Sequence, residues 1–403
     1  MRIKPTVSVI SPDRIEQGIE LRLNVKGMPV SDSLLDIPKT FAYHPLFNSH
    51  DHLIGNWFPR SGEKRPYPNS HIWVEDMKQS FAYLERNIFW INDGSFDLLK
   101  PHANLLARLG CYKNIFSGCG TVQDHTPIQP DIYYDSFPIN VLKRYRQCHS
   151  ITLDNWWGGE TAEEEMRLSG GSMPFVIHLS EGTDEITHKE FSVLKHRNLL
   201  QPNLLIIHGI ALSKAELKEI AKVGASICWC PVSNFYLIGK TLDIKSCLEL
   251  GINVVLGTDS TQSGGINILD EMSQAHLHFP DIPLQTLYQM ITVNAAKALY
   301  MAPETAILNP TDTSNLLLID ALEQDPFENL LEVNSEHIRL LLHDGIPIYG
   351  DMEWLERFQS LQADYTEFRV GKREKFIIGD PLELNDQIDA ALGYHKDFPY
   401  LPF

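Results

Sequence analysis

The middle of the chain alternates between short apolar runs and longer stretches in which apolar residues recur with helical spacing. Each run is short enough for a buried strand, and each stretch that follows has the period of an amphipathic helix. The clearest pairs are residues 174–181 with 185–197, 204–208 with 213–223, 225–230 with 242–249, and 254–259 with 268–276. Strands that alternate with helices predict βαβ units and a parallel sheet.

This rhythm predicts an α/β fold built around one barrel. Eight βα units close a (β/α)8 TIM-like barrel of about 250 residues, and residues 44–310 provide enough chain for it. The third and fourth units must fall within residues 126–172, where proline, glycine, tryptophan and charged residues interrupt the pattern. The positions of those two strands are left open.

The two ends of the chain have a different pattern, with short strand-like runs separated by turn residues. Such runs occur at residues 6–10, 19–25, 315–319, 338–342 and 346–349. They predict that residues 1–43 and 311–365 form one composite β-sheet domain, as a small β-sandwich. Residues 366–403 are polar and aromatic, and we expect them to form a C-terminal extension.

Composition and charge restrict the partners. The 403 residues are 43% hydrophobic and 21% charged, as in ordinary globular domains. A net charge of −18 without a basic cluster argues against nucleic acid and anionic membranes. The six cysteines form no Cys-x-x-Cys pair, no run of about 18 apolar residues occurs, and the first residues lack a signal-peptide core. We therefore expect a cytoplasmic protein that acts on a small molecule, and a homodimer is left open.

Candidate chemistry begins with the segment His50-x-His52, which follows an apolar run. In a strand, residues i and i+2 point to the same side, so the two imidazoles can bind one cation. The pair alone is weak evidence, because 16 histidines in 403 residues produce about 0.6 such triplets by chance. A second triplet, at His276 and His278, lies in a predicted helix, where the two side chains diverge. We expect that one to be structural or to lie at the surface.

Three later apolar runs also end in residues that can bind a metal or move protons. One run delivers His178, with Glu181 three residues on; the next ends in His208, and the last ends in Asp259. Taken singly, each has an ordinary alternative, namely a surface loop, a capped core histidine or a helix N-cap. Taken together, they match the rule that catalytic residues of a (β/α)8 barrel sit at the carboxyl ends of its strands.

The combined set predicts one metal site. His50, His52 and His178 supply nitrogen ligands and Asp259 supplies oxygen, a combination that suits zinc or, alternatively, iron(II). Glu181 is then a nearby carboxylate that can pass a proton from the activated water to a leaving nitrogen.

These elements, in this order, resemble the amidohydrolase superfamily, and within it the mononuclear branch of cytosine, guanine and adenosylhomocysteine deaminases and triazine hydrolases. That branch has His-x-His after its first strand, His-x-x-Glu after the fifth, His after the sixth and Asp after the eighth. The segment Cys230-Pro-Val-Ser-Asn234 is similar to the family's turn after the seventh strand, and residues 292–299 resemble its helix after the barrel. The similarity runs from about Asp124 to Asn294.

The resemblance implies a role for each residue. Glu181 corresponds to the proton shuttle, and His208 to the residue that orients the attacking water and polarises the bond being broken. Asp259 doubles as the base that accepts the water proton, and whether His208 also binds the metal is left open. No lysine stands where the fourth strand should end, so one divalent metal is expected. By the same resemblance, His50, His52, His178 and Asp259 correspond to the metal ligands.

The chain departs from the family pattern in two places. The family's Pro-Gly before the His-x-His segment is replaced by Tyr43-His-Pro-Leu-Phe47, and the region between the second and fifth strands is short. Substrate residues are expected there and after the first strand, so the substrate is not defined. By position, the candidates for substrate contact are Trp57, Arg60, His71, His125, Trp156 and Trp157.

The sequence therefore predicts a metal-dependent amidohydrolase that breaks a C–N bond, with deamination of an aminated heterocycle as the first choice. A hydrolase of a small amide, a cyclic imine or a C–Cl bond is the alternative within the same class. A barrel that binds metal without catalysis is the alternative from a different class.

Overall fold

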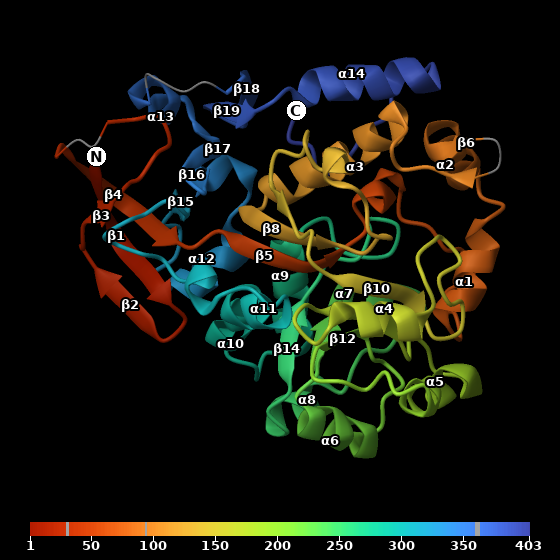
Figure 1. The fold of residues 1–403 in the computed structure, drawn as a ribbon. Coiled ribbons are helices and arrows are strands. Elements are labelled where there is room, and N and C mark those ends of the chain that lie inside the picture. Colours follow the sequence, from red (N-terminus) through yellow and green to blue (C-terminus); the bar gives the residue numbers. More distant parts are fainter. Residues whose placement is uncertain (30–31, 93–94, 359–362) are drawn as a thin grey trace.

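The candidate metal-binding and catalytic residues lie on parallel strands or just after them. The computed structural model describes residues 1–29, 32–92, 95–358 and 363–403 (Figure 1). A three-stranded parallel sheet consists of β5 (Leu46–Asp51), β8 (Cys119–Asp124) and β9 (Asn140–Val141). A five-stranded parallel sheet consists of β10 (Arg146–Ser150), β11 (Phe175–Leu179), β12 (Leu204–His208), β13 (Ser226–Trp229) and β14 (Asn253–Leu256).

Within each sheet, the strands are neighbours in chain order, which is the order of a TIM-type barrel. The pairs β9–β10 and β14–β5 share no ladder, so no closed barrel ladder is observed in the described ranges. The ends of β14 and β5 are nevertheless adjacent, because the N–H groups of Thr258 and Asp259 donate to the carbonyl of His50 at 2.9 and 3.1 Å. The prediction of a TIM-barrel-like α/β fold is confirmed at this level.

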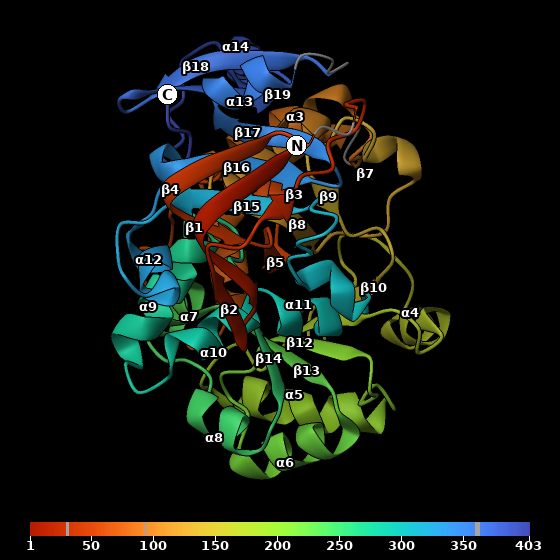
Figure 2. The ribbon, with the colours of Figure 1, turned by 90° about the vertical axis from the view of Figure 1, so that its left-hand side faces the viewer.

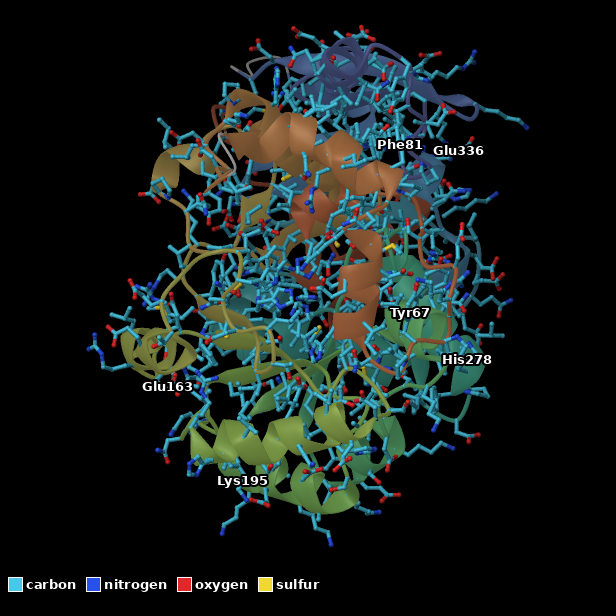
Figure 3. The ribbon with its side chains drawn as sticks, turned by 90° about the vertical axis from the view of Figure 1, so that its right-hand side faces the viewer. Tyr67, Phe81, Glu163, Lys195, His278 and Glu336 are labelled. Carbon is cyan, nitrogen blue, oxygen red and sulfur yellow. The ribbon has the colours of Figure 1, made fainter. Side chains whose placement is uncertain are left out.

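Helices cover the outer side of the five-stranded sheet (Figures 1 and 2), among them α4 (Ala162–Ser169), α5 (Glu185–His196), α6 (Lys214–Val223) and α8 (Ile244–Glu249). Local sequence defines their ends. Ser213 begins α6 with a capping box to Glu216, and Gly224, with φ of 84°, ends it. Lys195 of α5 lies on the outer surface (Figure 3) and pairs with Glu219 of α6 at 2.5 Å.

The segment between β5 and β8 is long and helical. It contains the 3-10 helix η1 (Leu53–Trp57), α1 (Ser70–Met77), α2 (Phe81–Trp90) and α3 (Pro101–Ile115). The third and fourth strands, which the sequence could not locate, are β9 and β10. Two residues of β9 are too short a run for any hydrophobic period to be read.

Strands from both chain ends lie in one nine-stranded sheet. The N-terminal members are β1 (Arg2–Ser11), β2 (Arg14–Gln17), β3 (Leu21–Arg22) and β4 (Leu34–Tyr43). The C-terminal members are β15 (Leu316–Asp320), β16 (Ile338–His343), β17 (Ile346–Asp351), β18 (Tyr365–Val370) and β19 (Arg373–Ile378). Because β4 pairs antiparallel with β15, the two ends join edge to edge in one sheet. The predicted β-sandwich is therefore not confirmed.

The C-terminal region is more regular than its composition suggests. Strands β18 and β19 extend the nine-stranded sheet, and α14 (Pro381–Leu392) packs against α3. The last residues pack near η1, where Tyr400 donates its hydroxyl to the carbonyl of Asn56 at 2.8 Å. The division into residues 1–43 with 311–365, 44–310 and 366–403 stays a prediction, and residues 30–31, 93–94 and 359–362 of it lie outside the described residues.

Two further expectations concern helices. His276 and His278 lie in α9 (Ile268–His278) as predicted, and the His278 ring stacks on Phe235 at 4.1 Å. Within the described ranges, no helix has the length and apolarity needed to cross a bilayer.

Candidate active site

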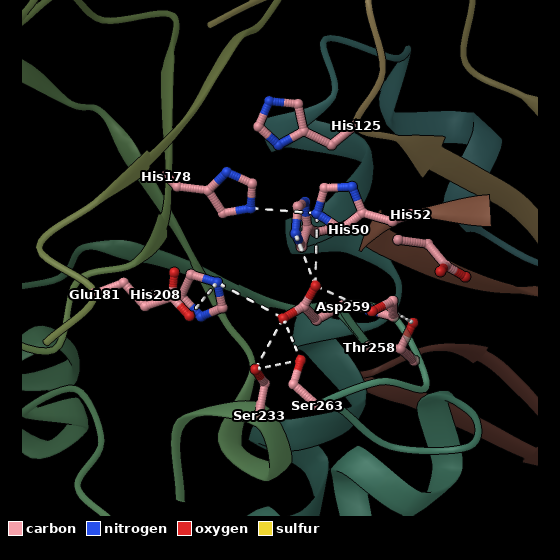
Figure 4. A network of polar contacts seen from close by, with 12 residues as sticks. His50, His52, His125, His178, Glu181, His208, Ser233, Thr258, Asp259 and Ser263 are labelled. Atoms are coloured by element: carbon pink, nitrogen blue, oxygen red, sulfur yellow. Dashed lines mark hydrogen bonds and ion pairs between the residues drawn. The ribbon is translucent and has the colours of Figure 1, made fainter. Parts of the chain in front are cut away.

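The predicted site residues converge at one end of the parallel strands (Figure 4). His50 lies in β5 with His52 just after it, His178 lies in β11, and His208 ends β12. Asp259 follows three residues after β14. Because the carboxyl ends of the strands meet at one face of a barrel, residues far apart in the chain share one site.

The ring nitrogens lie at distances that suit a shared metal. His52 Nε2 is 3.3 Å from His178 Nε2, and His52 Nε2 and His50 Nε2 are 3.5 and 3.9 Å from Asp259 Oδ1. Atoms bound tetrahedrally to zinc at about 2.0–2.1 Å lie about 3.3 Å apart. The buried His50 Nε2 has no hydrogen-bond partner among the described residues. These observations fit a metal-binding site, since a buried polar atom is otherwise paired.

Hydrogen bonds on the far side of two rings orient the nitrogen that faces the site. His178 donates from Nδ1 to the carbonyl of His149 at 2.7 Å, and His208 donates from Nδ1 to Oδ1 of Asn234 at 2.8 Å. In the neutral form of either ring, the lone pair of Nε2 then faces the centre.

Burial keeps the central histidines neutral. It lowers the pKa of His50, His125 and His178 well below the usual histidine range, and neighbouring imidazoles lower each further. Burial also lowers the pKa of His52, although Asp259 opposes that shift. The neutral imidazole is the form that binds a metal ion.

Asp259 is held as an anion. Burial acts to raise its pKa, but the rings of His52 and His208 and a hydroxyl of Ser233 outweigh burial, so the pKa is lowered. Its Oδ2 accepts hydrogen bonds from the hydroxyls of Ser233 and Ser263 at 2.8 and 3.0 Å. Its Oδ1 faces His50 and His52. The two oxygens therefore have different partners.

Three residues at these strand ends adopt left-handed backbone conformations. The φ angles of Ser180, His208 and Asp259 are 57°, 70° and 54°. Such angles cost a residue other than glycine about 1–3 kcal/mol and persist where the surrounding structure fixes them. The strain coincides with the site, which is where a fixed side-chain geometry matters most.

Glu181 lies beside the histidine cluster, and its Oε1 is 3.5 Å from His208 Nε2. The residue is buried, and burial raises the pKa of its carboxyl group, although His208 opposes the shift. A carboxyl group with a raised pKa can accept a proton and release it again near neutral pH.

A pocket opens over these groups, with a volume of about 720 Å³ including its mouth. Its inner part contains His52, His178, Glu181, His208 and Asp259. Its outer wall is mostly aromatic, with Phe58, Trp73, Tyr83, Trp156 and Trp157. Flat apolar side chains of this kind suit a ring-shaped substrate.

The positional candidates for substrate contact divide into two groups. Trp156 and Trp157 line the pocket, and His125 lies within the histidine cluster. The other three face elsewhere: Trp57 packs between Phe89 and Phe398, Arg60 contacts the carbonyl of Gly264, and His71 lies 3.4 Å from Glu190.

Two histidines have more prominent positions than the sequence indicated. His125 groups with His50, His52 and His178, their ligand atoms all within 4.8 Å of one another. His149, the penultimate residue of β10, lines the pocket, and the sequence pattern did not point to it. A histidine near the end of a strand was the available signal, but β10 lies in the stretch where no strand could be placed.

The chain matches the amidohydrolase family over residues 151–349. The 5-methylthioadenosine/S-adenosylhomocysteine deaminase of Pyrococcus furiosus is 34% identical over 179 residues, 41% of each protein. Its counterpart in Pyrococcus abyssi is 33% identical over 217 residues, 50% of this chain and 48% of that protein. The chain thus spans about half or less of these curated relatives. The predicted resemblance to the deaminase and chlorohydrolase branch of the amidohydrolases is confirmed.

Solved structures show the same fold over almost the whole chain. A triazine hydrolase variant has a TM-score of 0.71 at 17% identity, covering 97% of this chain and 99% of that one. An adenosine deaminase from Xanthomonas campestris with bound zinc has a TM-score of 0.67 at 16% identity, covering 89% and 98%.

Proposed function

We propose that this protein is a metal-dependent hydrolase of C–N bonds that deaminates an aminated heterocycle. The observation that carries the proposal is the convergence of three histidine nitrogens and one carboxylate beside a second, buried carboxyl group. The first group has the composition of a metal site, and the second is placed to move protons.

The residues that would hold the metal are His50, His52, His178 and Asp259. One divalent ion is proposed, zinc in the first place and iron(II) as the alternative, because the donors are nitrogen and oxygen. When bound, the ion supplies Lewis acidity that makes water nucleophilic near neutral pH. His125 is a further nitrogen within reach of the same group.

The protein's own side chains account for the proton movements. Asp259 is an anion in the folded chain and accepts a proton from the attacking water. His208 donates from Nδ1 to Asn234, so its Nε2 is left to accept a hydrogen bond and orient that water. Glu181 passes a proton to the leaving nitrogen. The water oxygen bonds to the sp² carbon, the C–N bond breaks, and the nitrogen leaves as ammonia.

The substrate class follows from the pocket and the relatives. Relatives named as 5-methylthioadenosine/S-adenosylhomocysteine deaminase and 5'-deoxyadenosine deaminase support a substrate with an amino group on a flat ring. The aromatic outer wall of the pocket suits such a ring. A small amide, a cyclic imine or a C–Cl compound is the second choice, and the likeness to triazine hydrolase favours including triazines. The cytoplasmic location and the homodimer stay predictions.

Ammonia release tests this function. Purified protein of known metal content is incubated with aminated purines, pyrimidines, pterins and triazines, and ammonia is measured by a coupled assay. We expect release from at least one ring class. Bound metal without ammonia from any compound would instead favour the barrel that binds metal without catalysis.

A further inference from the structure

A fully buried lysine lies behind the histidine cluster. Lys113 belongs to α3, and neither it nor its partner Asp51 has any exposed side-chain surface. Burying a charge is costly unless it is paired and hydrogen-bonded. A buried lysine at this position therefore indicates a requirement that an apolar residue would not meet.

Lys113 joins three separate segments of the chain. Its Nζ lies 3.3 Å from both carboxylate oxygens of Asp51, at the end of β5. It also donates to Oδ1 of Asn56 in η1 at 2.8 Å, and to Oγ1 of Thr258 after β14 at 3.1 Å. One ammonium group thus ties α3 to the two strand ends that lie at the unpaired edge between the sheets.

Asp51 is equally well bonded. Besides Lys113, it accepts hydrogen bonds from the side-chain amides of Asn48, Asn56 and Asn114 at 3.1, 2.8 and 2.7 Å. A buried network in which each member is satisfied is rigid, and removal of one member leaves its partners with one hydrogen bond fewer.

The network is adjacent in sequence to the predicted ligands. Asp51 is the residue between His50 and His52, and Thr258 directly precedes Asp259. Strands β5 and β14 share no ladder, so their separation is fixed by side chains and by the few bonds of the loop.

We infer that Lys113 is a positioning residue that fixes the spacing between the histidines of β5 and Asp259, and thereby the affinity of the site for a divalent cation. The inference rests on the proposed function only in that this site takes such a cation. Residues that orient metal ligands without touching the metal commonly change its affinity 10–100-fold, about the range expected here.

A second buried lysine in the same chain provides a matched control. Lys375 of β19 has no exposed side-chain surface, and its Nζ lies 2.7 Å from Oδ1 of Asp351. That pair lies in the nine-stranded sheet rather than at the site. Replacing either lysine by methionine removes a buried ammonium group from beside a buried aspartate. Asp351 keeps Arg339 and Arg373 at 3.2 and 3.3 Å, and only the replacement of Lys113 affects the spacing of the ligands.

The test compares zinc affinity with thermal stability. Full-length wild type, Lys113→Met and Lys375→Met are stripped of metal, and the zinc Kd is measured by competition with a chromophoric chelator, alongside the Tm of each metal-free protein. We expect both variants to lose stability, Lys113→Met to bind zinc about tenfold or more weakly, and Lys375→Met to keep the wild-type Kd. Wild-type affinity in Lys113→Met, or equal losses in both variants, would overturn the inference.

A milder variant keeps the test decisive if Lys113→Met does not fold. Thr258→Val has nearly the same shape but lacks the hydroxyl to which Lys113 and Asn48 donate. It should weaken zinc binding as well, and an unchanged Kd would contradict the proposed role. Zinc binding without ammonia release would refute the proposed function while leaving this inference in place, and absence of zinc binding in the wild type would refute both.

Discussion

Glu181 is the buried carboxyl group in contact with His208, and its chemistry can be separated from that of Asp259. The nearest oxygens of Glu181 and Asp259 lie 3.5 and 3.9 Å from His208 Nε2. Asp259 faces the histidine nitrogens, whereas Glu181 is absent from the predicted ligand set. Replacement of Glu181 therefore addresses proton transfer without removing a predicted ligand.

We predict that Glu181→Gln retains metal and loses about 10²–10⁴-fold in kcat, because glutamine cannot exchange a proton. Metal content by elemental analysis and steady-state ammonia release check the two parts. Glu185→Gln, four residues on and with an 82% exposed side chain, is the matched control and should keep full activity. Full turnover in Glu181→Gln would show that the proton moves by another route.

The sequence pattern is most informative for residues that follow a clear strand, and their roles as ligands or catalysts stay predictions. His178, His208 and Asp259 each lie at the end of a strongly apolar run, so the sequence indicates both a ligand-type side chain and its position at a strand end. Lys113 carried no such signal, because its significance depends on Asp51 and on Thr258, which is 145 residues away. Contacts between residues so far apart cannot be inferred from the local pattern of apolar and polar residues.

At the scale of elements, the approach of β14 to β5 occurs without a ladder between the two strands. Gly257, just after β14, permits it: an added Cβ would lie 2.7 Å from both Sγ of Cys228 and Cβ of His50. Ladder pairing does not reinforce this edge. The backbone at position 257 can therefore pack closely against His50 only because Gly257 has no side chain.

We expect Gly257→Ala to push β14 away from β5. Overpacking of this kind costs about 1–3 kcal/mol of folding stability, and it should also weaken zinc binding by displacing His50 relative to Asp259. Gly224→Ala is a comparison at a glycine where a Cβ meets no atom within 4 Å, although its φ of 84° adds backbone strain. Loss of stability in both variants, with zinc affinity lost in Gly257→Ala alone, is the expected pattern. Unchanged zinc affinity in Gly257→Ala would mean that the edge tolerates movement.

Elements were predictable where local signals agreed. The helices after β11 and β12 have strong caps and clear amphipathic spacing, and their predicted bounds hold to within a residue or two. Strands β9 and β10 could not be placed, since β9 has two residues and β10 contains three polar side chains and one histidine. The predicted sandwich is not confirmed, because β4 pairs with β15 and the two sets of strands form one sheet. These strands are far apart in the sequence, so local pattern does not show whether they stack as two sheets or pair within one.

At the scale of the whole molecule, the histidine cluster couples folding to pH. His149 has a pKa lowered to about 3 by burial and by the His52 and His71 rings, and burial lowers the pKa of His50, His125 and His178 well below the usual histidine range. In the unfolded chain these groups titrate near 6.5. Below that pH the unfolded state binds more protons than the folded state, so stability falls as pH falls.

The metal-free protein should accordingly lose stability as pH is lowered from about 6.5 toward 5, with full stability from these groups above 6.5. Each proton contributes about 1.4 kcal/mol per pH unit to the slope. Thermal melts of metal-free protein between pH 8 and 5 measure this, and His149→Gln should reduce the slope. A Tm that stays constant over this range would contradict the neutral, buried cluster.

The most direct test is a zinc titration of the metal-free protein. Ammonia release from the best substrate of the panel is measured after each addition, so the titration tests the metal site and the activity together. One cation held by His50, His52, His178 and Asp259 predicts no activity without metal, a linear rise on addition of zinc, and a plateau at about one equivalent per chain. Full activity in the metal-free protein would contradict the account, and a plateau at about two equivalents would contradict the single-metal site.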